Sequence, residues 1–196
     1  MADLFEVLAS DHRETLERLD SLRHAPHDRP EDHIRLNELT QELVIAASKH
    51  EAVEEMYFWP AVRDLGDKGV HLADAGLGEE VEGKRILDEL DSRTPSAPDF
   101  DEVLGRFSDA VRAHIRFEEE QVWPVLAPAL DQGARQALAA KVERARRLAP
   151  THPYPSAPLN PTALKAVGPA TGLADRARDA LTGRGQRPQD EAPAAG

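Results

Sequence analysis

The sequence predicts an all-α protein: an antiparallel up-down four-helix bundle with a short extra helix and a flexible, Pro/Ala-rich C-terminal tail. Apolar residues recur at helical spacing along four long segments, and no segment shows the apolar–polar alternation of a half-buried strand. The connectors between the four segments are short and contain proline or glycine. Long amphipathic helices joined by short connectors pack as antiparallel neighbours in a bundle.

The four expected bundle helices cover residues 3–24, 30–65, 70–92 and 99–130. Pro30 suits the first turn of the second helix, and Pro60 is expected to kink this helix or to weaken its last turns. The third helix is the least regular, because glycines interrupt its first half and each costs about 1 kcal/mol relative to alanine. Asp99 and Glu102 resemble a capping box that begins the fourth helix.

The composition changes after the bundle. Residues 134–148 are expected to form the short extra helix, which is amphipathic and ends in basic residues. From Pro150 onward proline and alanine dominate and the apolar stripe stops, which is typical of a flexible segment. One short helix near residues 172–182 fits the pattern within it. We therefore divide the chain into a bundle over residues 1–149 and a mostly flexible tail over residues 150–196.

The composition also argues against several classes of function. The formal net charge is −12 and no dense basic run occurs, which disfavours nucleic acid and anionic membranes as partners. The chain has no cysteine, so any metal must be held by histidine and carboxylate. No signal peptide is recognisable, and no apolar run reaches the ~20 residues that span a bilayer. We therefore expect a cytoplasmic protein.

Two nearly identical stretches carry the candidate chemistry. They run from His50 to Pro60 and from His114 to Pro124, and in each a glutamate follows the histidine by four residues and a Trp-Pro pair ends the stretch. Residues i and i+4 share one face of a helix. Both pairs continue the apolar stripe of their helix, as His12 does in the first helix. The expected inward-facing polar residues are His12, His50, Glu54, His114 and Glu118.

A carboxylate among apolar residues is costly unless it is protonated, paired or coordinated. We expect no buried lysine or arginine on these stripes, so a bound cation is the remaining partner. Histidine and carboxylate ligands without thiolate suit iron better than structural zinc. The neighbouring Glu55, Glu119 and Glu120 are interpreted as solvated, and the other histidines as surface residues. Tyr57, one turn after Glu54, either fills the core or donates a hydrogen bond to a bridging ligand.

Together these residues resemble the hemerythrin-like proteins, the HHE cation-binding family. The resemblance covers about residues 1–130. It rests on the order of three motifs, which are Asp11-His12-Arg13, the pair His50 and Glu54, and the pair His114 and Glu118. The resemblance implies a four-helix bundle around an oxo- or carboxylate-bridged di-iron centre. Members of the family bind O2 reversibly, sense O2 or iron, or react with NO and peroxide.

One position departs from the family pattern. Members usually carry a histidine in the third helix, often as Glu-His followed by a basic residue, where this chain has Glu82-Gly83-Lys84. Glu79 lies one turn before Gly83 and is a candidate ligand in place of that histidine. Alternatively, the position is vacant and leaves one iron open to a small molecule, or the second metal is lost. The two metal positions are therefore expected to be inequivalent.

Three functions remain open on the sequence. The first is a di-iron protein that binds or reacts with a small oxidant such as O2, NO or peroxide. If it is an enzyme, it is a peroxidase or detoxifies NO or peroxide. The second is a non-catalytic sensor or binder of O2 or iron, and the third is a bundle whose degenerate metal site is only structural. An open coordination position favours the first, because it admits substrate.

Overall fold

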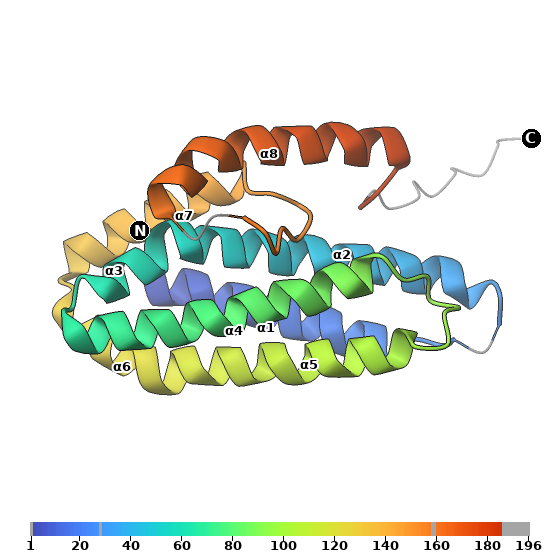
Figure 1. Cartoon of the computed structure of the whole chain (residues 1–196), viewed down its shortest axis with the longest axis horizontal. Coiled ribbons are helices and arrows are strands. Elements are labelled where there is room, and N and C mark those ends of the chain that lie inside the picture. The colour runs from blue at the N-terminus through green and yellow to red at the C-terminus, as the bar shows by residue number, and fades with distance from the viewer. Residues whose placement is uncertain (1, 28, 158–159, 186–196) are drawn as a thin grey trace, which may run out of the picture.

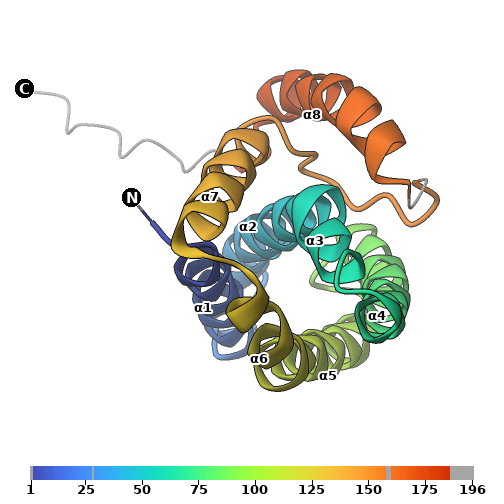
Figure 2. The same ribbon diagram turned by 90° about the vertical axis from the view of Figure 1, so that its left-hand side faces the viewer.

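The computed structural model describes residues 2–27, 29–157 and 160–185, and these residues form helices and connectors without any β-strand. Four long helices run antiparallel and enclose a common core, as the end-on view in Figure 2 shows. They are α1 (Leu4–Arg23), α2 (Asp32–Val53), α4 (Asp67–Asp91) and α5 (Phe100–Phe117). The predicted four-helix bundle is therefore confirmed. Among the described residues, no helix is long and apolar enough to cross a membrane.

The second and fourth predicted helices are each interrupted by one π-helical turn. The interruptions are η1 (Glu54–Phe58), followed by α3 (Trp59–Arg63), and η2 (Glu118–Val122), followed by α6 (Trp123–Leu126) and the 3-10 turn η3 (Ala127–Ala129). In each turn the backbone N–H of the tryptophan donates to the carbonyl of the glutamate five residues earlier. The next residue is a proline, which has no N–H to continue the α-helical pattern. The predicted disturbance at Pro60 is thus a widened turn, and Pro124 has the same effect in the other copy.

The core has two apolar parts with a polar layer between them. In α1, Leu4 and Leu8 belong to one apolar cluster, while Leu19 and Leu22 belong to the other. The buried residues between them on the same helix are Asp11, His12 and Thr15. The inward faces of the other three bundle helices also carry buried polar residues at this level. This layer is where the candidate site lies.

Two further helices follow the bundle, α7 (Gln132–Arg146) and α8 (Pro161–Thr182). Figure 1 shows both lying over the α2 side of the bundle. The predicted helix over residues 134–148 corresponds to α7. The short helix predicted near residues 172–182 is only the second half of α8, which begins after Asn160 caps the N–H groups of Thr162 and Ala163. Residues 186–196 of the predicted tail lie outside the described residues.

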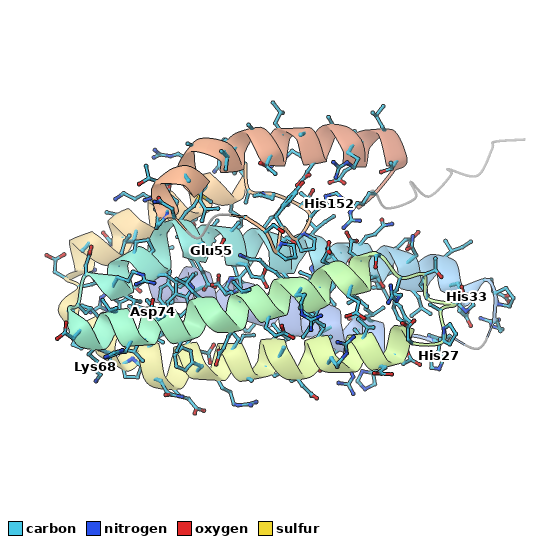
Figure 3. The ribbon with its side chains drawn as sticks, in the orientation of Figure 1. His27, His33, Glu55, Lys68, Asp74 and His152 are labelled. Carbon is cyan, nitrogen blue, oxygen red and sulfur yellow. The ribbon has the colours of Figure 1, made fainter. Side chains whose placement is uncertain are left out.

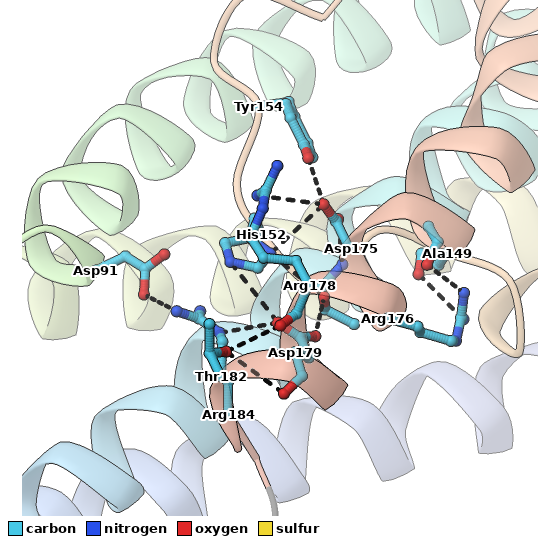
Figure 4. Close-up of polar contacts among 12 residues, drawn as sticks. Asp91, Ala149, His152, Tyr154, Asp175, Arg176, Arg178, Asp179, Thr182 and Arg184 are labelled. Atoms are coloured by element: carbon cyan, nitrogen blue, oxygen red, sulfur yellow. Dashed lines mark hydrogen bonds and ion pairs between the residues drawn. The ribbon is translucent and has the colours of Figure 1, made fainter.

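Buried carboxylates connect α8 to the rest of the chain (Figure 4). Asp175 is fully buried and accepts hydrogen bonds from the Thr151 backbone N–H at 3.0 Å and from the Tyr154 hydroxyl. Asp179 accepts from the Thr151 hydroxyl at 2.6 Å. Arg184, just beyond α8, pairs with Asp91 of α4 at 2.7 Å. These contacts join residues far apart in the sequence, so spacing alone could not predict them.

Candidate metal centre

Six side chains bring their donor atoms together in the polar layer, in two overlapping groups. In each group the histidine nitrogens and carboxylate oxygens lie within 4.8 Å of one another. Glu54 and Glu118, the first residues of the two π-helical turns, belong to both groups. The first group adds His12 and His50, and the second adds His114 and Glu80. Glu79 belongs to neither group and contacts His114 of the second group from outside.

The first group is built by α1 and α2 with the two shared glutamates. Nε2 of His12 lies 3.0 Å from Oε2 of Glu118, and Nε2 of His50 lies 3.2 Å from Oε2 of Glu54. The opposite ring nitrogens face other carboxylates. Nδ1 of His12 lies 2.8 Å from Glu119, and Nδ1 of His50 lies 3.6 Å from Asp11. Outer carboxylates of this kind fix the tautomer and orientation of a metal-binding histidine.

The second group is built by α4 and α5. Nε2 of His114 lies 3.4 Å from Oε1 of Glu118 and 4.0 Å from Oε1 of Glu80. Nδ1 of the same ring lies 3.0 Å from Oε2 of Glu79. Oε1 of Glu80 accepts a hydrogen bond from the indole N–H of Trp59. All three histidines therefore present Nε2 to the centre of the layer and Nδ1 to its edge.

The inner atoms of the layer lack hydrogen-bond partners, and this favours a bound cation. Both carboxylate oxygens of Glu54 and of Glu118 are buried without a hydrogen bond, as is Nε2 of each of the three histidines. Both glutamates are fully buried. Buried polar atoms are normally satisfied, and a cation between the two shared carboxylates would satisfy all of these atoms together. The residues present therefore fit a metal site.

The pKa values in this layer reflect the same crowding of charge. Burial raises the pKa of Glu54 well above its ordinary value, and the nearby Glu118 and Glu80 carboxylates add to the rise. Burial would also raise the pKa of Glu118, but His114 and His12 lower it below its ordinary value. Burial would lower the pKa of His114, yet Glu118, Glu79 and Glu80 raise it well above its ordinary value. The raised pKa values favour protonated Glu54 and His114 in the metal-free layer, and metal binding would release these protons.

Comparison with known proteins identifies the family of the chain. The family model described as the hemerythrin HHE cation binding domain matches residues 3–126. The chain belongs to the hemerythrin HHE cation-binding domain family. The resemblance predicted from the three motifs is therefore confirmed, and domains of this family bind metal ions.

The chain is similar to a hemerythrin-like protein and to a solved structure of an HHE domain-containing protein. An uncharacterized hemerythrin-like protein of Schizosaccharomyces pombe is 24% identical over 182 residues, which cover 92% of this chain and 87% of that protein. A crystal structure of a hemerythrin HHE cation binding domain-containing protein from Mycobacterium kansasii superimposes with a TM-score of 0.63 at 22% identity. The superposition covers 75% of this chain and 86% of the other. The structural similarity supports the fold, and the yeast match extends well beyond residue 126.

The third bundle helix of this HHE domain differs from the sequence prediction. Glu79, the predicted ligand, lies outside both groups of donor atoms and contacts the outer nitrogen of His114. Glu80 instead brings its carboxylate into the second group. A Cβ placed at Gly83 would have Oε1 of Glu51, at 3.6 Å, as its one neighbour within 4 Å, so none of the donor atoms lies that close to it. The inward position one turn after Glu80 is occupied by Lys84, which is buried.

Among the described residues, Lys84 is the one buried lysine or arginine, and it lies on α4, not on the stripes that carry the predicted histidine donors. Its ammonium pairs with Glu55, which is also buried. The prediction that Glu55 is solvated was therefore wrong. Figure 3 shows Glu55 on the side of the bundle that faces α8, whereas His27 and His33 lie near the connectors at one end. Burial would lower the pKa of Lys84, but the carboxylates of Glu80, Glu51 and Glu55 raise it. Lys84 is thus paired outside the shared carboxylates of Glu54 and Glu118, which still need a partner.

The structure also shows the exposure of Glu119 and Glu120 and the position of the Tyr57 ring. Glu120 is exposed, as predicted, and Glu119 is also exposed but contacts His12. The ring of Tyr57 packs beside the first apolar cluster, with Nζ of Lys165 lying 4.7 Å from its centroid. Tyr57 is therefore partly a core residue, and it faces α8.

Proposed function

We propose that this HHE domain binds two iron ions and that the pair binds or reacts with a small oxidant such as O2, NO or peroxide. The observation that carries the proposal is the pair of overlapping donor groups that share Glu54 and Glu118. A carboxylate with two buried, unpartnered oxygens is suited to bridging two cations. Donor sets of histidine and carboxylate without thiolate favour iron over structural zinc.

In this proposal each metal position has its own terminal ligands. His12 and His50 belong to the first position, and His114 and Glu80 belong to the second. The second position thus has one histidine where the first has two, so the ions are inequivalent. Glu80 replaces Glu79 as the proposed α4 ligand, and Glu79 orients His114 through its outer nitrogen.

The residues around the centre have defined tasks in the proposed chemistry. When bound, the iron pair would supply electrons and a coordination position for the oxidant. Glu119 and Asp11 hold the rings of His12 and His50 from outside, and Arg146 pairs with Asp11 from α7. The apolar clusters on both sides of the layer keep bulk water away from the centre. Each group offers four donor residues, which is fewer than the coordination number that iron usually adopts, so an open coordination position would remain for the oxidant.

The test is to load the purified protein with iron and to follow its absorption while peroxide or NO is added. Reaction predicts near-UV charge-transfer bands that change with the oxidant and peroxide or NO consumed over several turnovers. Spectral change without consumption would instead indicate a sensor or binder. A protein that folds normally but takes up no iron would contradict the proposal and would indicate a degenerate site.

A further inference from the structure

A small cavity lies beside the second donor group, at the position where α4 has a glycine. It has a volume of about 20 Å³, and its walls include Gly83, Glu80 and His114. About one water molecule fits into a cavity of this size. A longer side chain at Gly83 would point toward Glu51 and fill part of this space. The cavity is therefore a chamber for a very small molecule next to the proposed second metal position.

A much larger cleft lies outside the bundle, under the C-terminal segment. Its volume is about 540 Å³. Its walls come from the bundle, at Ala52 and Lys84 among others, and from the C-terminal segment, at Tyr154 and Thr171. Figure 1 shows that the connector after α7 and the helix α8 lie over this side of the bundle. We refer to this space as the α8 cleft.

Among the described residues, Glu51 alone lines both the α8 cleft and the chamber. Its Oε1 lies 3.6 Å from the place of a Cβ at Gly83, and its Oε2 is buried without a hydrogen-bond partner. The side chain is 8% exposed. It is also absent from both donor groups. Glu51 is thus a barrier between the two spaces that can change rotamer without moving a proposed ligand.

A second cleft lies on the opposite side of α2, between α1, α2 and α7, but its contact with the chamber is different. That cleft has a volume of about 660 Å³ and shares Thr15 and His50 with the chamber. His50 is held between Asp11 and Glu54, and Thr15 is buried. Opening this side would displace a proposed ligand. The chamber can therefore open toward the α8 cleft without displacing a proposed metal ligand.

We propose that the small oxidant reaches the second metal position through the α8 cleft and past the side chain of Glu51. This inference rests on the proposed function. The small size of the chamber favours very small ligands, such as O2, NO, peroxide or azide. In the proposed route, the function of Gly83 is to leave the chamber open, since a histidine there would fill it. The function of α8 in this proposal is to form a wall of the route.

The test measures the association rate of azide with the oxidised, iron-loaded protein by stopped-flow absorption. Ala52→Phe narrows the α8 cleft from the bundle, and Thr171→Phe narrows it from α8. Ala46→Phe is the matched control, because Ala46 is also half-buried on α2 but lines the opposite cleft. We expect both α8-cleft variants to slow azide association roughly tenfold, which is within the range over which association rates vary among variants of one binding site. Ala46→Phe should leave the rate unchanged, and Glu51→Ala should raise it.

The iron content of each variant separates this inference from the proposed function. Variants with wild-type iron content and wild-type rates overturn the route and leave the proposed function intact. A slower rate in Ala46→Phe alone also overturns it, in favour of the opposite cleft. If Ala52→Phe fails to fold, Thr171→Phe decides the question, because it lies on α8 outside the bundle core. A wild-type protein without iron overturns the proposed function and the route together.

Discussion

Glu80 is the candidate site residue that the sequence pattern did not predict. It lies three residues after Leu77 and seven before Leu87, which are both buried on the inward face of α4. Glycines interrupt the apolar stripe of this helix, so periodicity cannot decide between Glu79 and Glu80. The histidine–glutamate pairs of the other helices are predictable, because every helix puts residues i and i+4 on one face. Which α4 glutamate faces inward depends on how that helix packs against Trp59, and this is a tertiary property.

The roles of the two neighbouring glutamates can be separated by metal affinity. We expect Glu80→Ala to remove the second iron, because it deletes a proposed ligand. Glu79→Ala should retain both irons but bind the second about 10- to 100-fold more weakly, as is usual when an outer carboxylate is lost. Metal titrations of both variants check this. Stronger loss in Glu79→Ala than in Glu80→Ala would reverse the assignment.

The glycines of α4 differ in what surrounds them. We expect Gly83→Ala to raise the free energy of unfolding by up to about 1 kcal/mol, the helix-propensity gain of alanine, because its Cβ would make only an ordinary contact with Glu51. Gly78→Ala is the control for propensity alone, since nothing lies near its Cβ position. Gly76→Ala should destabilise the protein, because its Cβ would overlap the Trp59 ring. Denaturant unfolding of the three metal-free variants checks this order; equal effects at all three positions would contradict it.

At the level of elements, the two π-helical turns connect the repeated sequence motif to the site. Each begins at a shared glutamate and ends before a Trp-Pro pair. The disturbance at Pro60 could be predicted, but its form could not, because a proline is compatible with a kink, a break or a widened turn. The full length of α8 also could not be predicted from the sequence. Gly168, Pro169 and Gly172 are typical helix breakers, and only tertiary contacts such as those of Asp175 offset them.

The attachment of α8 can be tested at Asp175. Asp175→Ala would leave the Thr151 N–H and the Tyr154 hydroxyl without their acceptor. We expect a loss of about 1–3 kcal/mol in the free energy of unfolding, the usual cost of unsatisfied buried donors. We also expect faster proteolysis within residues 150–182. Asp109→Ala, at an exposed position on α5, is the control. Unchanged proteolysis in Asp175→Ala would argue that α8 is not held by this residue.

For the whole molecule, the buried polar layer makes stability depend on pH and on metal. Burial raises the pKa of Glu54 and Glu80 well above the ordinary value of 4.5. The folded metal-free protein therefore keeps protons that the unfolded chain releases, and its stability falls as the pH rises above 4.5. The raised pKa of His114 also makes stability fall as the pH rises. Burial lowers the pKa of His50, and this opposes the fall in stability.

We expect the melting temperature of the metal-free protein to fall between about pH 5 and about pH 8. Iron loading should reverse this trend, because metal binding requires deprotonated ligands and becomes tighter as the pH rises. Thermal unfolding of both forms across this range checks the prediction. A metal-free protein that becomes more stable toward pH 8 would contradict the account of the buried carboxylates.

The central claim is that one polar layer holds two metal ions that share Glu54 and Glu118. The most direct measurement is the ratio of iron to protein, determined by elemental analysis after loading and desalting. We predict about two irons per chain for the wild type and about one each for His12→Ala and His114→Ala, with His71→Ala as an exposed-histidine control. One iron or none in the wild type, or an iron content that His12→Ala and His114→Ala leave unchanged, would contradict the claim.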